Sequence, residues 1–509
     1  MCGIAVAIDW DDADASVRAL SRGVLHRGDV SDPVVSPRPD TAMATRRLRV
    51  VDSHRAVQPQ ASFDGRLLVS FNGEIYNHDE IRRELSALGV TSRTESDTEV
   101  LANALQMWGA GAFARLNGMF AFVAIDVASG DFLAARDPFG VKPLYVVQSQ
   151  TGFLFCSEIR PLLEVAPEGD VLLLPPGYML TRKICAGYKS ALLGPFEGRS
   201  PGDAAMLDAL LAEAVRTRLP RDLPVATMLS GGIDSTLVAH YARRFRPDAP
   251  AYFLGGEDTE DFRFAAAYAD KSGTMLRVVP FDGAAALARL DEAVAQSETF
   301  EPAVIRAAVC SLTLSQAMHR DGFRVALCGE GADELFAGYA PLEQAFDHSE
   351  ETGRTVRNEC LDLMHRTCLQ RIDRCAMRYQ LEAREPFLDP AIAAYALNLR
   401  GSALVDGQGK KPLRALYDLY PDELPAIIRD RRKVPFGEDL DEAFWSTFFE
   451  STLTEQDFRD GQREFALFAP QTREEVYCLR TLSRTMDIFR VPHLRGRPQL
   501  SLPLSDAVA

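Results

Sequence analysis

The feature that most constrains the fold is an alternation of helical patterns and short apolar runs that begins near residue 204. A helical pattern over residues 204–219 precedes the apolar run VATML at 225–229, a glycine turn and another helical pattern. Three more apolar runs continue this alternation, at 251–254, 275–281 and 325–328. Strands separated by helices favour a parallel sheet, because parallel neighbours need a long crossover connection. We therefore predict an α/β doubly wound parallel-sheet domain, with a helical C-terminal part after residue 340.

Residues 1–190 follow a different pattern of short strands, turns and two helices. RLLVSFNGEIYN at 66–77 predicts a strand broken at Asn-Gly, and residues 120–137 predict a hairpin around a Ser-Gly turn. The two helices are expected over 79–89, closed by Gly89, and over 95–108, capped by Ser96. A stretch rich in Gly, Pro and Ser at 193–203 predicts the linker. The expected domains are residues 1–195 and 204–509.

The overall charge argues against two classes of partner, and the cysteine pattern indicates the redox state of the compartment. A formal net charge of −16 repels nucleic acid and anionic membranes, so we expect neither as a partner. Apolar runs end well short of the ~20 residues of a membrane span, and the N-terminus lacks the basic region of a signal peptide. Nine cysteines without a regular spacing indicate reduced thiols. We predict a cytoplasmic protein.

Cys2 directly follows the initiator methionine. If Met1 is removed, one residue carries both a thiol and an α-amine with a pKa of about 7.7–8.0, which can accept the thiol proton near neutral pH. Nucleophile and base then belong to the same residue. Taken alone, Cys2 is better interpreted as a small buried residue entering a strand.

Five separated motifs change that interpretation: MCGI at 1–4, RLRVVD at 47–52, NGEIYN at 72–77, SDTE at 96–99 and RDPFGVKPLY at 136–145. Together they resemble the class II glutamine amidotransferases. The resemblance implies an α+β N-terminal domain, an Ntn-type αββα sandwich. It implies that Cys2 attacks the glutamine amide while Asn72 and the Gly73 N–H stabilise the oxyanion. It further implies that glutamine is bound by Arg47, Leu48, Arg49, Val50, Val51, Asn72, Gly73, Glu74 and Asp97.

The charges of this glutamine site match the substrate. Arg47 suits the α-carboxylate of glutamine, and Asp97 and Glu74 suit its α-ammonium. Alone, Asn72-Gly73 would be a plain turn and Asp97 a helix-start charge. One departure stands out, because the chain reads HRGDV at 26–30 where the family usually reads HRGPD. The missing proline is expected to loosen a loop beside the glutamine pocket.

The second site begins at SGGIDS, residues 230–235, between a predicted strand and a helix. A glycine turn with exposed N–H groups at a helix start is an anion site, and the lysine of a Walker A loop is absent. The motif resembles the PP-loop of ATP pyrophosphatases, which adenylate a carboxylate. CGEGADELFAGY at 328–339 resembles asparagine synthetases. This resemblance implies that ATP is bound by Leu229, Ser230, Gly231, Gly232, Asp234, Ser235, Leu254, Cys328 and Gly329.

Further roles in the second site follow from the same resemblance. Asp234 and Asp333 would hold Mg²⁺ on the pyrophosphate, since Mg²⁺ prefers hard oxygen ligands shared with phosphates. Glu330 would act as a base towards ammonia or organise the adenylate. Lys433, in RRKVPFG at 431–437, would contact the phosphates, although a solvated basic run is the usual interpretation of such a stretch. REPFLD at 384–389 and GQGKKPLR at 407–414 also match the family.

The acceptor segment is SETFEPAVIRAA, at 297–308. Arg306 matches the arginine expected to bind the acceptor carboxylate, but Ala303 and Val304 replace two threonines of the family pattern. Loss of two hydroxyl donors can shift substrate discrimination strongly.

We predict a glutamine-hydrolysing, ATP-dependent asparagine synthetase that uses ATP and Mg²⁺ and acts on small molecules. A homodimer is one assembly that the sequence allows. One alternative is a relative in specialised metabolism that activates another carboxylate, such as glutamate, and uses another amine. The other is a glutaminase or binding protein without synthetase turnover.

Overall fold

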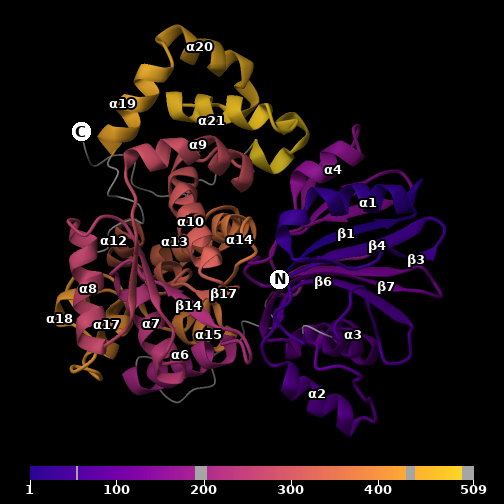
Figure 1. The fold of residues 1–509 in the computed structure, drawn as a ribbon, viewed down its shortest axis with the longest axis horizontal. Helices are drawn as coiled ribbons and strands as arrows, with labels where there is room; N and C mark the ends of the chain where they lie inside the picture. Colours follow the sequence, from indigo (N-terminus) through magenta and orange to yellow (C-terminus); the bar gives the residue numbers. More distant parts are fainter. Residues whose placement is uncertain (53–54, 190–202, 432–441, 496–509) are drawn as a thin grey trace.

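The computed structural model describes residues 1–52, 55–189, 203–431 and 442–495. Two antiparallel sheets pack face to face in the N-terminal half (Figure 1). The first contains β1 (Cys2–Ile8), β2 (Val30–Ser31), β3 (Val35–Arg38), β4 (Thr41–Arg47), β9 (Tyr145–Gln148), β10 (Phe153–Cys156) and β11 (Leu172–Leu173). The second contains β5 (Gln60–Ala61), β6 (Leu67–Ile75), β7 (Gly118–Asp126), β8 (Phe132–Arg136), β12 (Tyr178–Leu180) and β13 (Cys185–Gly187).

Helices cover both outer faces of this pair of sheets. α1 (Ala13–Gly23) and α4 (Ile159–Val165) lie on the first sheet, and α2 (His78–Ala87) and α3 (Asp97–Trp108) on the second (Figure 1). The Ser96 side chain accepts from the Thr98 N–H, which confirms the predicted cap of α3. The expectation of only two helices is wrong. The buried stripe of α1, at Ala13, Val17 and Leu20, is short and interrupted by polar residues.

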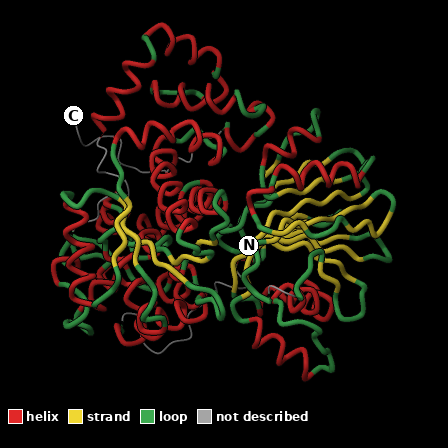
Figure 2. The backbone as a smooth tube through the Cα atoms, viewed as in Figure 1, coloured by secondary structure: helices red, strands yellow, loops and turns green. Residues whose placement is uncertain are grey.

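The second half contains a parallel five-stranded sheet, whose strands are the yellow segments on the left of Figure 2. Its order is β16 (Leu276–Val279), β15 (Ala251–Leu254), β14 (Val225–Met228), β17 (Val325–Leu327) and β18 (Glu382–Arg384). Reversal of the strand order at β14 and β17 makes their carboxyl ends a switch point, where ligands bind in open α/β sheets. β18 is an exception to the helical pattern expected after residue 340. The predicted linker falls almost entirely outside the described residues.

Helices surround the parallel sheet, and after β17 the described chain is mostly helical. The crossover and flanking helices are α6 (Ala204–Arg218), α7 (Ile233–Phe245), α8 (Glu260–Ser272), α9 (Gly283–Ser297) and α10 (Pro302–Arg320). The later helices are α11 (Ala332–Leu335), α12 (Ala340–His348), α13 (Glu350–Leu363), α14 (Cys368–Met377), α15 (Pro390–Leu397), α16 (Gly401–Leu404), α17 (Lys411–Tyr417), α18 (Ala426–Arg429), α19 (Glu442–Thr452), α20 (Glu455–Glu464) and α21 (Arg473–Ser483). No described helix is long and apolar enough to cross a membrane.

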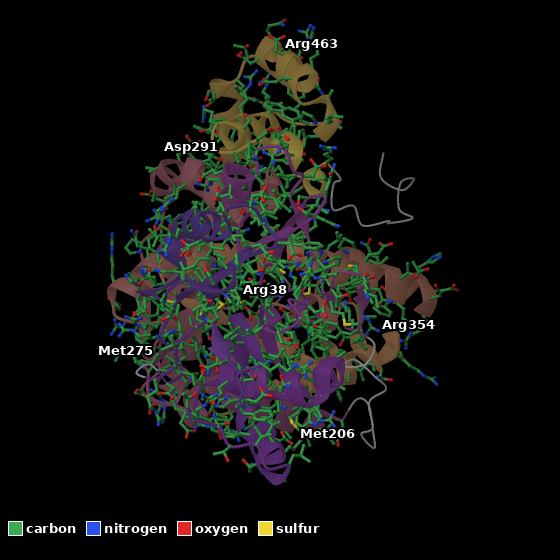
Figure 3. The ribbon with its side chains drawn as sticks, turned by 90° about the vertical axis from the view of Figure 1, so that its right-hand side faces the viewer. Arg38, Met206, Met275, Asp291, Arg354 and Arg463 are labelled. Atoms are coloured by element: carbon green, nitrogen blue, oxygen red, sulfur yellow. The ribbon has the colours of Figure 1, made fainter. Side chains whose placement is uncertain are left out.

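The last three helices form a layer that stacks on α9. In the side view, Arg463 of α20 marks the far tip of this layer, and Asp291 of α9 lies below it (Figure 3). The Tyr477 hydroxyl of α21 donates to Asp291 Oδ1 at 2.8 Å. Buried Trp445 and Phe449 of α19 join the same apolar cluster as α9 and α10. The layer is therefore anchored by apolar packing and by polar contacts.

One hydrophobic cluster runs through the contact between the two halves. It joins Met1, Leu48, Tyr76, Met119 and Val141 of the first half to the buried residues around α7, α13 and α15 of the second. The N-terminal residue lies at this contact (Figure 1). The two halves thus share part of their core.

Candidate active sites

Strand β1 carries Cys2 at its first position, opposite Arg47 of β4. Cys2 is only 4% exposed, and its N–H donates to Asn72 Oδ1 at 2.8 Å. The Gln58 amide nitrogen lies 3.6 Å from Cys2 Sγ. Burial raises the pKa of the thiol. A thiol in this setting needs a nearby base before it can act as a nucleophile.

Two groups beside Cys2 are suited to stabilise an oxyanion. Asn72 Nδ2 is buried and has no hydrogen-bond partner among the described residues. A buried donor without a partner is costly in a folded protein unless a ligand completes it. Gly73 has φ 155°, and a Cβ there would lie 2.1 Å from the Met119 carbonyl oxygen. Only glycine fits this position, so the backbone approaches its neighbours without obstruction.

Buried residues of both charge signs lie near Cys2 in the predicted glutamine site. Arg47 is 8% exposed and donates from Nε to Asp32 at 2.9 Å, while its Nη1 is buried without a hydrogen-bond partner among the described residues. Glu74 and Asp97 are also buried. Burial, followed by the charge of Asp97, raises the pKa of Glu74, and burial raises that of Asp97. Two buried carboxylates with raised pKa values favour an incoming cation, because it would stabilise both ionised forms.

The residues after β4 that were predicted to bind glutamine, 48–51, differ in how deeply they are buried. Leu48 is buried and its N–H donates to the Met1 carbonyl at 2.8 Å. Val50 and Val51 are half-buried. Arg49 is ion-paired with Asp29 and its side chain is 42% exposed. The structure therefore places the Arg49 guanidinium near the surface.

Asp29 stands where the family pattern has proline, and its contacts tie the loop down. Its carboxylate accepts from the Arg49 N–H at 3.2 Å, from Arg49 Nε at 2.9 Å and from Arg324 Nη1 at 2.6 Å. Partial burial opposes ionisation, but these hydrogen bonds lower the pKa of Asp29. The loosened loop expected from the missing proline is therefore not what the structure has, since ion pairs hold it.

Buried charges connect the glutamine site to the parallel sheet. The Met1 amine donates to Glu382 Oε2 at 2.7 Å. Arg384 of β18 donates to Glu382 at 2.6 Å and to Glu74 at 3.2 Å. Nearby, Asp373 of α14 accepts from Arg27 at 2.8 Å and from Lys142 at 3.3 Å. Fixed ion pairs between the halves set the orientation of the first site against the second.

A cavity of about 770 Å³ opens at the carboxyl ends of β14, β15 and β17. It is large enough for a nucleotide and a small acid together. Most predicted ATP residues line it, namely Leu229, Ser230, Asp234, Ser235, Leu254, Cys328 and Gly329. Gly231, with φ 72°, and Gly232, the N-cap of α7, form the turn beneath and are not in the lining.

The two predicted metal ligands converge beside this cavity. Asp234 lies in the first turn of α7 and Asp333 in α11. Both carboxylates contact the ammonium of Lys410, at 2.5 Å and 2.6 Å. Their geometry therefore fits one cation held between them. No group of three acidic, His or Cys side chains that could hold a metal occurs among the described residues, so a metal here would need other oxygen ligands.

One wall of the cavity carries both polar and apolar groups. Arg371 of α14 lies in the lining and donates to Ser311 Oγ at 2.6 Å and to Glu330. Glu330 also lines the cavity. Apart from Ser311, the lining residues of α10 are mostly apolar and include Ala303 and Val304. The positions where threonines were expected therefore do face the cavity.

Arg306 is not brought together with these groups. It is absent from the lining residues, and its guanidinium forms ion pairs with Glu442 of α19 and Glu474 of α21. These contacts dock the C-terminal layer on α10. Lys433 lies outside the described residues.

Sequence reasoning missed several residues that contact the predicted ones, and four of them bear directly on the two sites. They are Gln58 beside Cys2, Asp32 on Arg47, Arg371 on Glu330, and Lys410 on the aspartate pair. Lys410 lies in the GQGKKPLR motif, which could have indicated it, whereas the other three carry no local signal.

Comparison with known proteins matches both halves. A model for the glutamine amidotransferase domain matches residues 1–172, and a model for asparagine synthase matches residues 206–358 and 342–482. Among solved structures, a glutamine phosphoribosylpyrophosphate amidotransferase from B. subtilis covers 55% of this chain and 66% of its own, at 16% identity and a TM-score of 0.32. That similarity is too remote to carry an argument.

Several curated plant proteins resemble nearly the whole chain. A glutamine-hydrolysing asparagine synthetase of Triphysaria versicolor is 29% identical over 94% of this chain and 85% of its own length. One from Oryza sativa subsp. japonica is 30% identical over 86% and 77%, and one from Arabidopsis thaliana 29% over 86% and 78%. With both halves matched in order, the chain belongs to the asparagine synthase family, with a glutamine amidotransferase domain at its N-terminus.

Proposed function

We propose that this chain is a glutamine-hydrolysing asparagine synthetase, a C–N ligase of amino-acid biosynthesis. It converts aspartate, glutamine and ATP to asparagine, glutamate, AMP and pyrophosphate. The observation that carries this proposal is the presence of two distinct sites in one chain. One has a buried cysteine beside Asn72, whose amide nitrogen has no hydrogen-bond partner among the described residues, and the other has an aspartate pair at a nucleotide-sized cavity.

The glutaminase half, residues 1–195, is proposed to be an Ntn-type αββα sandwich. After removal of Met1, the Cys2 amine takes the thiol proton, and the thiolate attacks the glutamine amide. Asn72 Nδ2 and the Gly73 N–H donate to the oxyanion. Arg47 binds the α-carboxylate through its open Nη1, while Asp97 and Glu74 bind the α-ammonium. Leu48, Arg49, Val50 and Val51 complete the pocket mainly through their backbone.

The synthetase half, residues 204–509, is proposed to be a PP-loop domain that adenylates the acceptor. The SGGIDS turn offers backbone N–H groups to the phosphates. Asp234 and Asp333 would hold Mg²⁺, which neutralises charge on the departing pyrophosphate when bound. Glu330 accepts a proton from the incoming ammonia, and Arg371 keeps Glu330 oriented. Lys433 is proposed to contact the phosphates.

Ammonia must travel from Cys2 to the cavity without loss to solvent. The buried cluster that joins the halves, including Met119 and Val141, supports an internal apolar route. Uncharged ammonia crosses such a region more readily than ammonium, because burying a charge is costly.

The test is product analysis with amide-¹⁵N glutamine, ATP and a panel of acids that includes aspartate and glutamate. We expect pyrophosphate release and ¹⁵N-labelled asparagine with aspartate. Pyrophosphate release with another acid, and none with aspartate, would reject the proposal. A glutaminase that releases no pyrophosphate with any acid would reject the synthetase half.

One observation favours a second candidate, an enzyme that amidates a different carboxylate. Ala303 and Val304 line the cavity while Arg306 does not. An apolar wall would suit an acceptor with a less polar side chain than aspartate, and the same panel of acids decides between the two.

A homodimer and a cytoplasmic location remain predictions, which light scattering of the purified chain and microscopy of a C-terminal fusion would check.

A further inference from the structure

The place between Asp234 and Asp333 is filled by a residue of the protein itself. Lys410 Nζ lies 2.5 Å from Asp234 Oδ2 and 2.6 Å from Asp333 Oδ1. The lysine side chain is 4% exposed, and each aspartate side chain is 12% exposed. The three residues come from α7, α11 and the start of α17, which are far apart in the sequence. The fold therefore brings the Lys410 ammonium between the two carboxylates proposed to hold a metal.

The surrounding backbone is shaped to let this lysine reach the pair. A Cβ at Gly338 would lie 2.0 Å from Asp333 Oδ1 and 2.2 Å from Lys410 Cε, so any larger residue would obstruct the contact. Lys410 itself has φ 54°, and its N–H donates to the Phe336 carbonyl at 3.1 Å. Ala337 also has a positive φ, 56°. Such conformations are unfavourable for non-glycine residues and cluster at functional sites.

An ammonium and a divalent cation cannot share this place. Both need the same two carboxylate oxygens, and at a few ångströms in a buried site their mutual repulsion is strong. Free metal must therefore displace Lys410 and leave its charge without a partner. A triphosphate in the adjoining cavity changes that balance, because its oxygens offer the displaced ammonium new acceptors.

We infer, resting on the proposed ATP-dependent function, that Lys410 occupies the metal position in the nucleotide-free enzyme and makes divalent-cation binding dependent on nucleotide. The metal enters together with the triphosphate, and Lys410 moves from the aspartates to the phosphates. Lys410 is thus both a placeholder cation and a phosphate ligand. Metal and nucleotide then favour each other's binding through one side chain.

The test is a titration of the full-length protein with Mn²⁺, in which electron paramagnetic resonance measures free Mn²⁺ with and without α,β-methylene-ATP. Lys410→Met is compared with Lys411→Met, whose lysine contacts only the Ser402 carbonyl among its described hydrogen bonds. The wild type and Lys411→Met should bind Mn²⁺ about 10-fold or more tightly when the analogue is present. Lys410→Met should bind one Mn²⁺ without the analogue, about 10-fold or more tightly than the wild type. Adding Asp234→Asn to Lys410→Met should remove this binding.

Each alternative outcome rejects the inference. If the wild type binds one Mn²⁺ without nucleotide as tightly as Lys410→Met, the lysine does not exclude metal. If folded Lys410→Met gains no binding, the aspartate pair is not the metal position. Glutaminase activity and the thermal midpoint report folding, and Lys410→Gln replaces the methionine variant if that one does not fold. The titration needs no turnover, so failure to form asparagine with the expected Mn²⁺ pattern would reject only the proposed function.

Discussion

Replacing Gly338 by alanine tests how tightly the aspartate pair must be held. The added Cβ would lie 2.0 Å from Asp333 Oδ1, whereas ordinary contact needs about 3.5 Å, so the carboxylate must move by about 1.5 Å. A misplacement of about 1 Å costs on the order of 100-fold in rate. We therefore expect pyrophosphate release to fall about 100-fold, which corresponds to about 2.7 kcal/mol. Overpacking should lower the free energy of unfolding by about 1–3 kcal/mol.

The assay is pyrophosphate release at saturating aspartate and ATP, with glutamine hydrolysis measured on the same preparation. Hydrolysis should stay within about twofold of the wild type, because Gly338 is in the other half of the chain. Gly111→Ala is the matched control, since the nearest heavy atom to its added Cβ is 3.9 Å away. If Gly338→Ala released pyrophosphate at the wild-type rate with unchanged stability, the proposed role of this packed aspartate–lysine contact would be wrong.

Three further predictions concern separate parts of the molecule. Cys2→Ala should abolish asparagine formation from glutamine but keep it from ammonium chloride, as measured by chromatography, and loss of both in a folded variant would contradict the division of labour. Arg306→Ala should lower the free energy of unfolding by about 1–3 kcal/mol, because it leaves buried Glu474 without its cation, and a change confined to the KM for the acceptor would contradict a docking role. Burial, with the charges of Asp333 and Glu330, raises the pKa of Glu334 to about 7. The unfolded chain loses this proton near pH 4.5 while the folded one keeps it, so stability falls as pH rises from about 4.5 to about 7. Glu334→Gln should therefore gain up to about 3 kcal/mol relative to the wild type at about pH 8 and nothing below pH 4.5, and a denaturant series with equal differences across that range would refute the shift.

The parts of the molecule predicted well are those with a local signal. Glycine turns after apolar runs located SGGIDS at the end of β14, and the N-cap at Ser96 located the start of α3. The three residues of β18 are too few for a periodic pattern, and what makes them a strand is pairing with β17.

Side-chain partners from distant segments could not be predicted in the same way. Arg306 and Ala307 are neighbours in sequence, but successive helical residues point about 100° apart. Ala307 faces the cavity and Arg306 faces α19 and α21. Lys410 reaches Asp234 across 176 positions. Only the packed structure relates such residues.

The hydrophobic cluster shared by the two halves has a consequence for how this enzyme can be dissected. Leu48, Tyr76 and Met119 of the first half are buried in one cluster with residues of the second. Cutting the chain near residue 200 would expose this apolar surface on both fragments, and such surfaces promote aggregation. Separate expression of either half should therefore give poorly soluble protein. Point substitutions in the intact chain are the practical way to obtain an enzyme that depends on ammonia alone.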